Sequence, residues 1–350
     1  MAVGGLPEHT STVGILRREF ERMMGNLRTR RSPMKVSVVI NTLNRCSHLE
    51  QALIALADQT YRPFEVVVVN GPSVDGTAGM LERFADRARL LDCPEANLGL
   101  SRNIGVQQAA GEIVAFIDDD AIPEPDWLEH VVGEFADLDV AAVGGPVFDL
   151  PLNRIEWKVC VATRLGEADT NAPMPFSSYN RPGADPFPYF AGCNMSFRRS
   201  ALRAIGGFNP MLKFGYDDVD VCRLLNDGGS TLRYAPAAVV RHARAPSATR
   251  DADHHVTDPY WWVYSRTVFA LQAGLRSERE QVATFVDDWV AEWRTYADNL
   301  LSEGIISAEM HERFLERASS GAVDGKADGL TQRPFQRVGR RPRGDFQPYI

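Results

Sequence analysis

The sequence predicts an α/β fold in which a mostly parallel central sheet is flanked by helices and followed by a helical C-terminal extension. From residue 34 to about 250, short apolar segments alternate with segments of helical periodicity. Apolar strands that alternate with helices are typical of a parallel sheet covered on both faces. Beyond 250, apolar residues recur at helical spacing, which indicates helices with one buried face.

The individual elements follow from these two patterns. The expected strands are 36–40, 64–69, 89–91, 113–117 and 140–144, and the expected helices are 49–57, 78–87 and 101–109. Residues 150–190 are rich in Pro, Asn and Ser, and we expect a long loop there. Shorter strand and helix patterns follow at 191–197, 200–205, 218–226 and 231–234, and longer helices at 282–300 and 308–317.

The chain divides into four parts by composition. Residues 1–33 form a basic, amphipathic N-terminal extension that either packs on the next domain or lies on a membrane surface. The α/β domain spans 34–250, and the helical C-terminal extension spans 251–318. The segment 319–350 contains Gly, Pro and several Arg, and we expect a disordered tail there.

Composition excludes several classes of protein. The 350 residues carry a net charge of −8, which argues against a general nucleic-acid binder because phosphate binding needs a basic face. The 5 cysteines are scattered and lack CxxC spacing, so neither a disulfide framework nor a zinc site is predicted. No apolar run approaches the roughly 18 residues that span a bilayer. We therefore expect a cytoplasmic protein, either free or peripheral at the inner face of the membrane.

Three consecutive carboxylates, Asp118, Asp119 and Asp120, follow the strand 113–117. Ligands of open α/β sheets bind just outside the carboxyl ends of the strands. Adjacent carboxylates there would repel one another unless a cation neutralised them. Oxygen ligands favour Mg²⁺ or Mn²⁺. The alternative is a solvated acidic loop.

Polar residues also stand where other expected elements end or begin. Asn41 and Thr42 end the first strand and Asn70 ends the second, where such side chains can meet a base or a ribose. Asp75 lies in the following turn, where it binds a ligand or caps the next helix. Arg102 lies in the first turn of the helix expected at 101–109; a cation there indicates a bound anion, unless Arg102 pairs with a surface carboxylate.

Asp217 and Asp218 form a second acidic group. Neighbouring carboxylates raise one another's pKa, which suits a general base that works near neutral pH. The alternative is an acidic cluster that stabilises the N-terminus of the helix 218–226.

Five segments in this order resemble the motifs of family 2 glycosyltransferases, which are inverting nucleotide-diphospho-sugar transferases with the Rossmann-like GT-A fold. The segments are 39–45 (VINTLNR), 69–77 (VNGPSVDGT), 97–105 (NLGLSRNIG), 116–120 (FIDDD) and 215–220 (GYDDVD). The resemblance covers roughly 60% of the chain, residues 35 to about 245. The chain departs from the family at Asn70, which is usually Asp, and at Asp217, which is usually Glu.

The resemblance implies roles for the residues singled out above. It implies that Asp120 binds Mn²⁺ or Mg²⁺, with His242 as a further candidate ligand, and that Asp218, or alternatively Asp217, is the catalytic base. The residues that it assigns to the nucleotide sugar are Asn41, Thr42, Asn70, Asp75, Arg102, Asp118 and Asp119. Asn194 and Tyr216 resemble positions on the acceptor side.

The implied function is metal-dependent, inverting transfer of a sugar from a nucleoside-diphosphate sugar to a hydroxyl group. The acceptor would be a glycan, a lipid-linked glycan or a small molecule, while membrane contact and homo-oligomerisation stay open. One alternative is a non-catalytic nucleotide-sugar-binding scaffold. Another is a sugar-nucleotide pyrophosphorylase, but the Gly-rich basic loop that such an enzyme carries after its first strand is missing here.

Overall fold

The computed structural model describes residues 32–150, 152–274, 279–335, 339 and 345–349. The chain forms two units, Met1–Met34 and Lys35–Ile350, and the description below concerns the second. The predicted N-terminal extension lies almost wholly outside the described residues. None of the described helices is both long enough and apolar enough to cross a bilayer.

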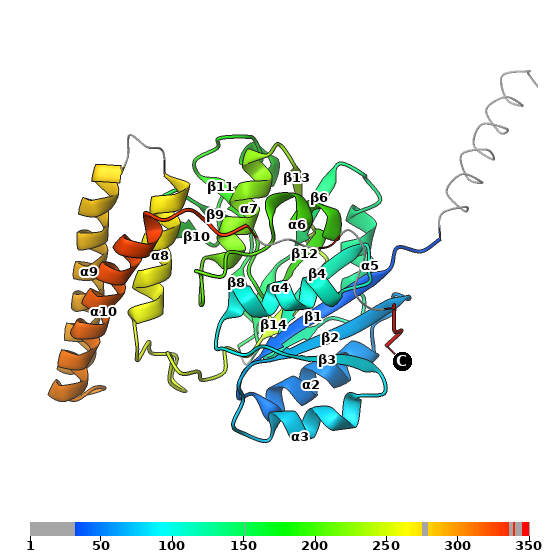
Figure 1. Ribbon diagram of the computed structural model, residues 1–350, viewed down its shortest axis with the longest axis horizontal. Coiled ribbons are helices and arrows are strands. Elements are labelled where there is room, and N and C mark those ends of the chain that lie inside the picture. The colour runs from blue at the N-terminus through cyan, green and yellow to red at the C-terminus, as the bar shows by residue number, and fades with distance from the viewer. Residues whose placement is uncertain (1–31, 151, 275–278, 336–338, 340–344, 350) are drawn as a thin grey trace, which may run out of the picture. The chain divides into compact units, whose positions relative to one another are not determined.

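The centre of the second unit is a seven-stranded sheet with the order β13-β6-β12-β4-β1-β2-β3 (Figure 1). Its strands are β1 (Val36–Thr42), β2 (Phe64–Asn70), β3 (Ala88–Asp92), β4 (Ile113–Asp118), β6 (Val140–Gly144), β12 (Met195–Arg198) and β13 (Thr231–Tyr234). Only β12 runs antiparallel to its neighbours within this sheet. The predicted mostly parallel sheet is therefore confirmed.

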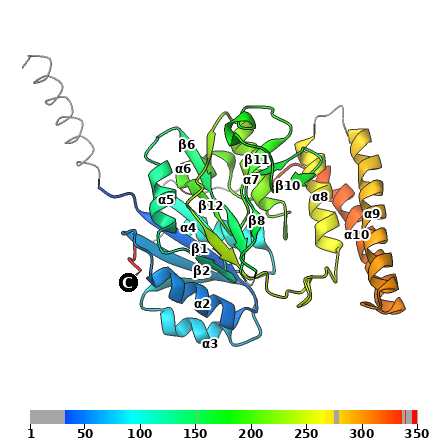
Figure 2. The ribbon, with the colours of Figure 1, turned by 180° about the vertical axis from the view of Figure 1, so that it is seen from behind.

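Helices cover the sheet between successive strands. They are α2 (Cys46–Ala57), α3 (Thr77–Leu81), α4 (Leu98–Gln108), α5 (Trp127–Glu134), α6 (Arg199–Ile205) and α7 (Asp217–Asp227). A 3-10 turn, Glu82–Phe84, follows α3. Figure 2 shows α2 and α3 together beside β1 and β2. Helix α4 packs closely on β1 because residue 105 is glycine: a Cβ there would lie 2.5 Å from Cγ1 of Val39.

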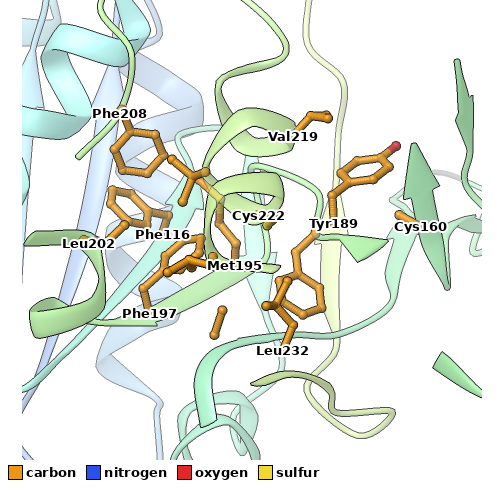
Figure 3. Packing of buried hydrophobic residues seen from close by; sticks show 14 of the residues in the cluster. Phe116, Cys160, Tyr189, Met195, Phe197, Leu202, Phe208, Val219, Cys222 and Leu232 are labelled. Atoms are coloured by element: carbon orange, nitrogen blue, oxygen red, sulfur yellow. The ribbon is translucent and has the colours of Figure 1, made fainter. Parts of the chain in front are cut away.

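The hydrophobic core lies between the sheet and the helices α6 and α7. Three rings from β4, β12 and the turn after α6 meet edge to face, and Figure 3 shows them around Met195 and Leu202. The ring centroids of Phe116 and Phe208 are 5.1 Å apart, and those of Phe116 and Phe197 are 6.1 Å apart. This packing fixes the strand that ends in the three aspartates.

The long loop predicted at 150–190 is wrong. This region contains short strands of two smaller sheets, with the orders β5-β14-β7-β8 and β10-β9-β11. The strands within 150–190 are β8 (Ile155–Trp157), β9 (Cys160–Ala162), β10 (Ala168–Asp169) and β11 (Phe187–Tyr189). The other strands of these two sheets are β5 (Ala121–Pro123), β7 (Val147–Asp149) and β14 (Val240–His242). A 3-10 turn, Phe176–Ser178, lies between β10 and β11. Triplets this short give too little periodicity for a strand to be predicted.

The helical C-terminal extension is observed as α8 (Tyr260–Ala273), α9 (Arg279–Ser302) and α10 (Ala308–Gly329), which lie side by side in Figures 1 and 2. The disorder predicted from residue 319 is wrong as far as Gly329. The glycines of α10 are its packing surface, since a Cβ on Gly321 would lie 2.5 Å from the carbonyl oxygen of Tyr260.

The end of the chain is also ordered where it is described. Tyr349 is 1% exposed. Its backbone N–H donates to the carbonyl of Phe64, and its hydroxyl donates to that of Leu53. The chain therefore returns to the start of β2, at the opposite end of this strand from the site described below.

Candidate active site

The strands β1, β2 and β4 end at one edge of the sheet and bring four predicted residues together. Asn41 is in register with Asp118, and Thr42 is in register with Asn70. The side-chain amide of Asn41 donates to Oγ of Ser101 at 2.6 Å. The hydroxyl of Thr42 is buried, and its side-chain hydrogen bond favours the ionised form of Asp119. These polar groups lie at the edge where ligands of open α/β sheets bind.

The turn after β2 is held by side chains. Oδ1 of Asn70 accepts from the hydroxyl of Ser73 at 2.8 Å. Asp75 is exposed and accepts from the backbone N–H groups of Thr77 and Cys46, which joins the starts of α3 and α2. The capping alternative for Asp75 is therefore what the structure shows.

The three aspartates occupy three different environments. The Asp118 side chain is 38% exposed, and one of its oxygens lies 3.8 Å from Nη2 of Arg102. Asp119 is buried, and burial together with the Asp120 charge raises its pKa to about 7, against the opposing effect of Arg45. Asp118 is therefore more accessible to a ligand than Asp119.

Asp120 is the most strongly held of the three. Its Oδ2 accepts from the backbone N–H of Ala245 at 2.8 Å and from Nη1 of Arg45 at 3.4 Å. Its Oδ1 lies 3.2 Å from Nε2 of His242. Burial opposes ionisation, but His242, Arg45 and the Ala245 N–H outweigh it and hold the pKa of Asp120 well below its usual range.

His242 is oriented by a residue that sequence reasoning missed. Nδ1 of His242 lies 3.2 Å from Oε2 of Glu156, whose other oxygen lies 3.0 Å from Nε of Arg244. Burial disfavours the charged ring, yet the hydrogen bonds to Asp120 and Glu156 raise the pKa of His242 to about 10. Glu156 could not be identified from the sequence, because its segment was expected to be a loop. Arg45 could have been identified, because it lies in the segment 39–45 that resembles a family motif.

The donor set at this edge fits a divalent cation. One carboxylate oxygen of Asp118, the sulfur of Cys193 and one ring nitrogen of His242 all lie within 4.8 Å of one another. Oδ1 of Asp120 lies 3.2 Å from Nε2 of His242 and therefore belongs to the same group of side chains. Carboxylate and imidazole ligands are those that Mn²⁺ and similar ions use in proteins.

Arg102 does not occupy the predicted position. Helix α4 begins at Leu98, because the Asn97 side chain accepts from the backbone N–H of Leu100, so Arg102 is the fifth residue of the helix. Its guanidinium is 3% exposed and pairs with Oδ2 of Asp217. The expected contact of Arg102 with a bound nucleotide sugar is therefore corrected. Arg102 instead pairs with the carboxylate of Asp217, which is buried and not on the surface.

The two carboxylates of the second acidic group differ in exposure. Asp217 is 1% exposed and paired with Arg102, whereas Asp218 is half-buried. Burial and the Asp217 charge raise the pKa of Asp218 to about 7, while Arg102 and the hydrogen bond from the Val219 N–H oppose the shift. Of the pair, Asp218 is the one that a substrate can reach.

The prediction that Asn194 binds an acceptor is wrong. Asn194 is 0% exposed. Its Oδ1 accepts from Nε1 of Trp127 at 2.9 Å, and its Nδ2 donates to the carbonyl oxygens of Pro146 and Ala238. These three hydrogen bonds give the Asn194 side chain a structural role. Asn is equally suited to either task, so its type could not decide between them.

Tyr216 lies directly before the acidic pair. Its φ of 62° places it in the left-handed region, at the N-cap of α7. Its hydroxyl donates to the carbonyl of Gly166 at 2.8 Å, and its ring centroid lies 5.6 Å from that of Phe269. The side chain is half-buried, and its contact with an acceptor stays a prediction.

Comparison with known proteins agrees with this geometry. The model of glycosyl transferase family 2 matches residues 37–206. A glucosyl-dolichyl phosphate glucuronosyltransferase of Haloferax volcanii is 30% identical over 264 residues, which cover 68% of this chain and 78% of the relative. A pre-mycofactocin glycosyltransferase of Mycobacterium tuberculosis is 31% identical over 219 residues, which cover 59% of this chain but only 42% of that longer relative.

A solved structure supports the fold independently. A mannosyltransferase of Pyrobaculum calidifontis in complex with GDP-Man and Mn²⁺ superposes with a TM-score of 0.51 at 18% identity, over 89% of this chain and 95% of the other. The arrangement of the sheet and its helices is thus that of the GT-A fold. The chain is a member of glycosyltransferase family 2, whose enzymes use nucleotide-sugar donors.

Proposed function

We propose that this protein is a metal-dependent inverting glycosyltransferase that moves a sugar from a nucleoside-diphosphate sugar to a hydroxyl group of a glycan or a lipid-linked glycan. Asp218 takes the proton of the acceptor hydroxyl as its oxygen attacks the anomeric carbon. The bond between that carbon and the diphosphate oxygen breaks, and the nucleoside diphosphate leaves with the electron pair. Attack from the face opposite the leaving group inverts the configuration.

One observation carries this proposal: Arg102 connects the two acidic groups. Its guanidinium pairs with Asp217 through Nη1 and faces Asp118 through Nη2 at 3.8 Å. Asp218, beside Asp217, is therefore held next to the edge of the sheet that we assign to the donor. Its half-buried carboxylate, with a pKa near 7, is suited to accept a proton near neutral pH.

The divalent ion would be held by Asp120 and His242, with Asp118 beside them. When bound, it would supply a positive charge that stabilises the departing diphosphate. The chain's own residues prepare this site, since Glu156 orients the His242 ring and Arg45 and Ala245 fix the Asp120 carboxylate. In the Pyrobaculum calidifontis structure, a protein of this fold holds Mn²⁺ together with GDP-Man.

The nucleotide would lie against Asn41, Thr42 and Asn70 at the ends of β1 and β2. The register of these strands supports this position, because it brings the polar side chains together at the edge where ligands of open α/β sheets bind. For the acceptor, the name of the Haloferax volcanii relative indicates a lipid-linked sugar substrate. This supports a lipid-linked glycan as the acceptor class for the present chain.

A binding panel tests the proposal. UDP-, GDP- and dTDP-sugars are titrated by calorimetry with and without Mn²⁺, using the full chain and the variant Asp120→Ala. We expect one nucleotide class to bind only with the metal, and Asp120→Ala to lose that metal dependence. Equal binding by Asp120→Ala would remove this residue from the metal site, and no binding by any donor would favour a non-catalytic scaffold.

A further inference from the structure

A cysteine lies among the side chains that we assign to the metal. The sulfur of Cys193, one oxygen of Asp118 and one ring nitrogen of His242 are mutually within 4.8 Å. Cys193 is 2% exposed and His242 is 7% exposed, whereas the Asp118 side chain is 38% exposed. Two of the three groups are therefore buried, and the third faces the substrate side.

The position of Cys193 is fixed by its two neighbours in the chain. Residue 192 is glycine, and a Cβ there would lie 2.6 Å from Nη2 of Arg102. On the other side, the backbone N–H of Asn194 donates to the carbonyl of Ala191 at 2.8 Å, and the Asn194 side chain is anchored by its three hydrogen bonds. The turn that carries the thiol is therefore rigid and pressed against the Arg102 guanidinium.

The distances suit a single ion. Metal–ligand distances are about 2.0–2.2 Å for imidazole and carboxylate and about 2.3 Å for thiolate. Ligand atoms on opposite sides of one ion are therefore about 4.4 Å apart at most. Asp118, Cys193 and His242 meet this limit after side-chain movements of a few tenths of an ångström. The ion would replace the hydrogen between Nε2 of His242 and Oδ1 of Asp120, which lie 3.2 Å apart, while Nδ1 keeps its contact with Glu156.

We propose that the sulfur of Cys193 is a further ligand of the divalent ion in this chain, in addition to the side chains of Asp118, Asp120 and His242. Thiolate is a soft ligand, and oxygen-only sites are those that suit Mg²⁺. The site therefore ranks Cd²⁺ and Zn²⁺ above Mn²⁺, and Mn²⁺ above Mg²⁺. This inference rests on the proposed metal site, and it adds a ligand and a metal preference to it.

Cadmium reports directly on sulfur coordination, because a cadmium–thiolate bond produces an ultraviolet charge-transfer band. We would titrate the full chain with Cd²⁺ alone and compare it with Cys193→Ser. The matched control is Cys93→Ser, because Cys93 is also 2% exposed and its thiol donates instead to the carbonyl of Glu95. The Cd²⁺ titration is then repeated in a large excess of Mn²⁺, and circular dichroism checks that each variant is folded.

We expect a band that saturates at one Cd²⁺ per chain in the unchanged protein and in Cys93→Ser. Excess Mn²⁺ should shift this titration to higher Cd²⁺ concentrations. Cys193→Ser should lose the band and bind Cd²⁺ at least about tenfold more weakly. A band that survives in folded Cys193→Ser, or no band in the unchanged protein, would overturn the inference.

These outcomes separate the inference from the proposed function. Mn²⁺-dependent binding of a nucleotide sugar together with no Cd²⁺ band would remove Cys193 as a ligand and leave the proposed transfer intact. A Cys193-dependent band whose titration excess Mn²⁺ shifts, in a chain that binds no nucleotide sugar, would keep the metal site and overturn the proposed transfer. If a large excess of Mn²⁺ leaves the Cd²⁺ titration unchanged, the two ions occupy different sites and the inference is wrong.

Discussion

Arg102 and Asp217 form a buried ion pair that joins α4 to α7, with side chains only 3% and 2% exposed. The guanidinium is also 5.8 Å from the ring centroid of Phe116 and 5.5 Å from that of Phe208, so it is enclosed by the core. The pair therefore connects the hydrophobic core with the start of the helix that carries Asp218.

Removing one partner of this pair should strongly destabilise the protein. The change Asp217→Asn removes the buried partner of Arg102 and leaves only the more exposed Asp118 carboxylate, 3.8 Å away, to compensate the charge, which costs about 3–5 kcal/mol in the free energy of unfolding. The control is Arg83→Ala, since the Arg83 side chain is 66% exposed in its pair with Glu50 and should contribute less than about 1 kcal/mol. Denaturant unfolding measures both. A loss for Asp217→Asn no larger than that for Arg83→Ala would contradict the structure.

The raised pKa of Asp218 predicts opposite effects of pH on activity and stability. A base must be ionised, so kcat/KM should rise as the pH passes through about 7. For stability the sign is reversed, because a folded-state pKa above the ordinary value of 3.8 means that the folded chain holds a proton that the unfolded chain releases. The stabilisation from protonated Asp218 is complete below pH 3.8 and is lost as the pH rises through about 7.

Rate and unfolding measurements between pH 4 and pH 9 test this prediction, with Asp218→Asn as the comparison. Asn does not titrate, so the variant should lack this part of the pH dependence of stability. An identical pH dependence of unfolding in the two proteins would show that Asp218 titrates normally.

The three hydrogen bonds of Asn194 predict a structural role. Asn194→Ala leaves Nε1 of Trp127 and the carbonyl oxygens of Pro146 and Ala238 without this partner, and each buried orphan costs about 1–3 kcal/mol. We expect a loss of at least about 3 kcal/mol, whereas Asn299→Ala, at an exposed site on α9, should stay within about 0.5 kcal/mol. Thermal and denaturant unfolding compare the two variants. If the two variants lose the same stability, the structural role is wrong and Asn194 is again a candidate contact of the acceptor.

The glycines of α10 predict an unusual response to alanine. In an open helix position, Gly→Ala stabilises by about 0.5–1 kcal/mol. Gly133→Ala on α5 should do so, because nothing lies within 4 Å of a Cβ placed there. Gly321→Ala should instead destabilise by about 1–3 kcal/mol, since its Cβ would meet the Tyr260 carbonyl oxygen at 2.5 Å. A stabilised Gly321→Ala protein would mean that α10 does not pack on α8 as described.

The sequence predicted the edge of the sheet well because parallel strands bring their carboxyl ends together. Asn41, Asn70 and Asp118 each follow an apolar run, so their meeting needed only the strand order. Partners far apart in the chain could not be predicted in this way. Arg45 reaches the Ala245 carbonyl across 200 positions, and Glu156 reaches His242 from a strand too short to recognise.

Residue type also led to wrong predictions where the same type of residue can serve two purposes. The glycines between 319 and 329 suggested disorder, although they allow two helices to approach closely. Arg102 near a helix start suggested a bound anion, although its partner is the carboxylate of Asp217, 115 positions away. In both cases the deciding contact comes from another part of the fold.

The most direct test of the account is the configuration of the sugar that is released when water replaces the acceptor. Proton NMR would follow an α-linked nucleotide sugar with Mn²⁺, using the unchanged chain and Asp218→Asn. We predict that the β-anomer appears first and that Asp218→Asn, which retains donor binding, loses at least about 100-fold in rate. Initial release of the α-anomer would contradict inversion, and an undiminished rate in Asp218→Asn would contradict the assignment of the base.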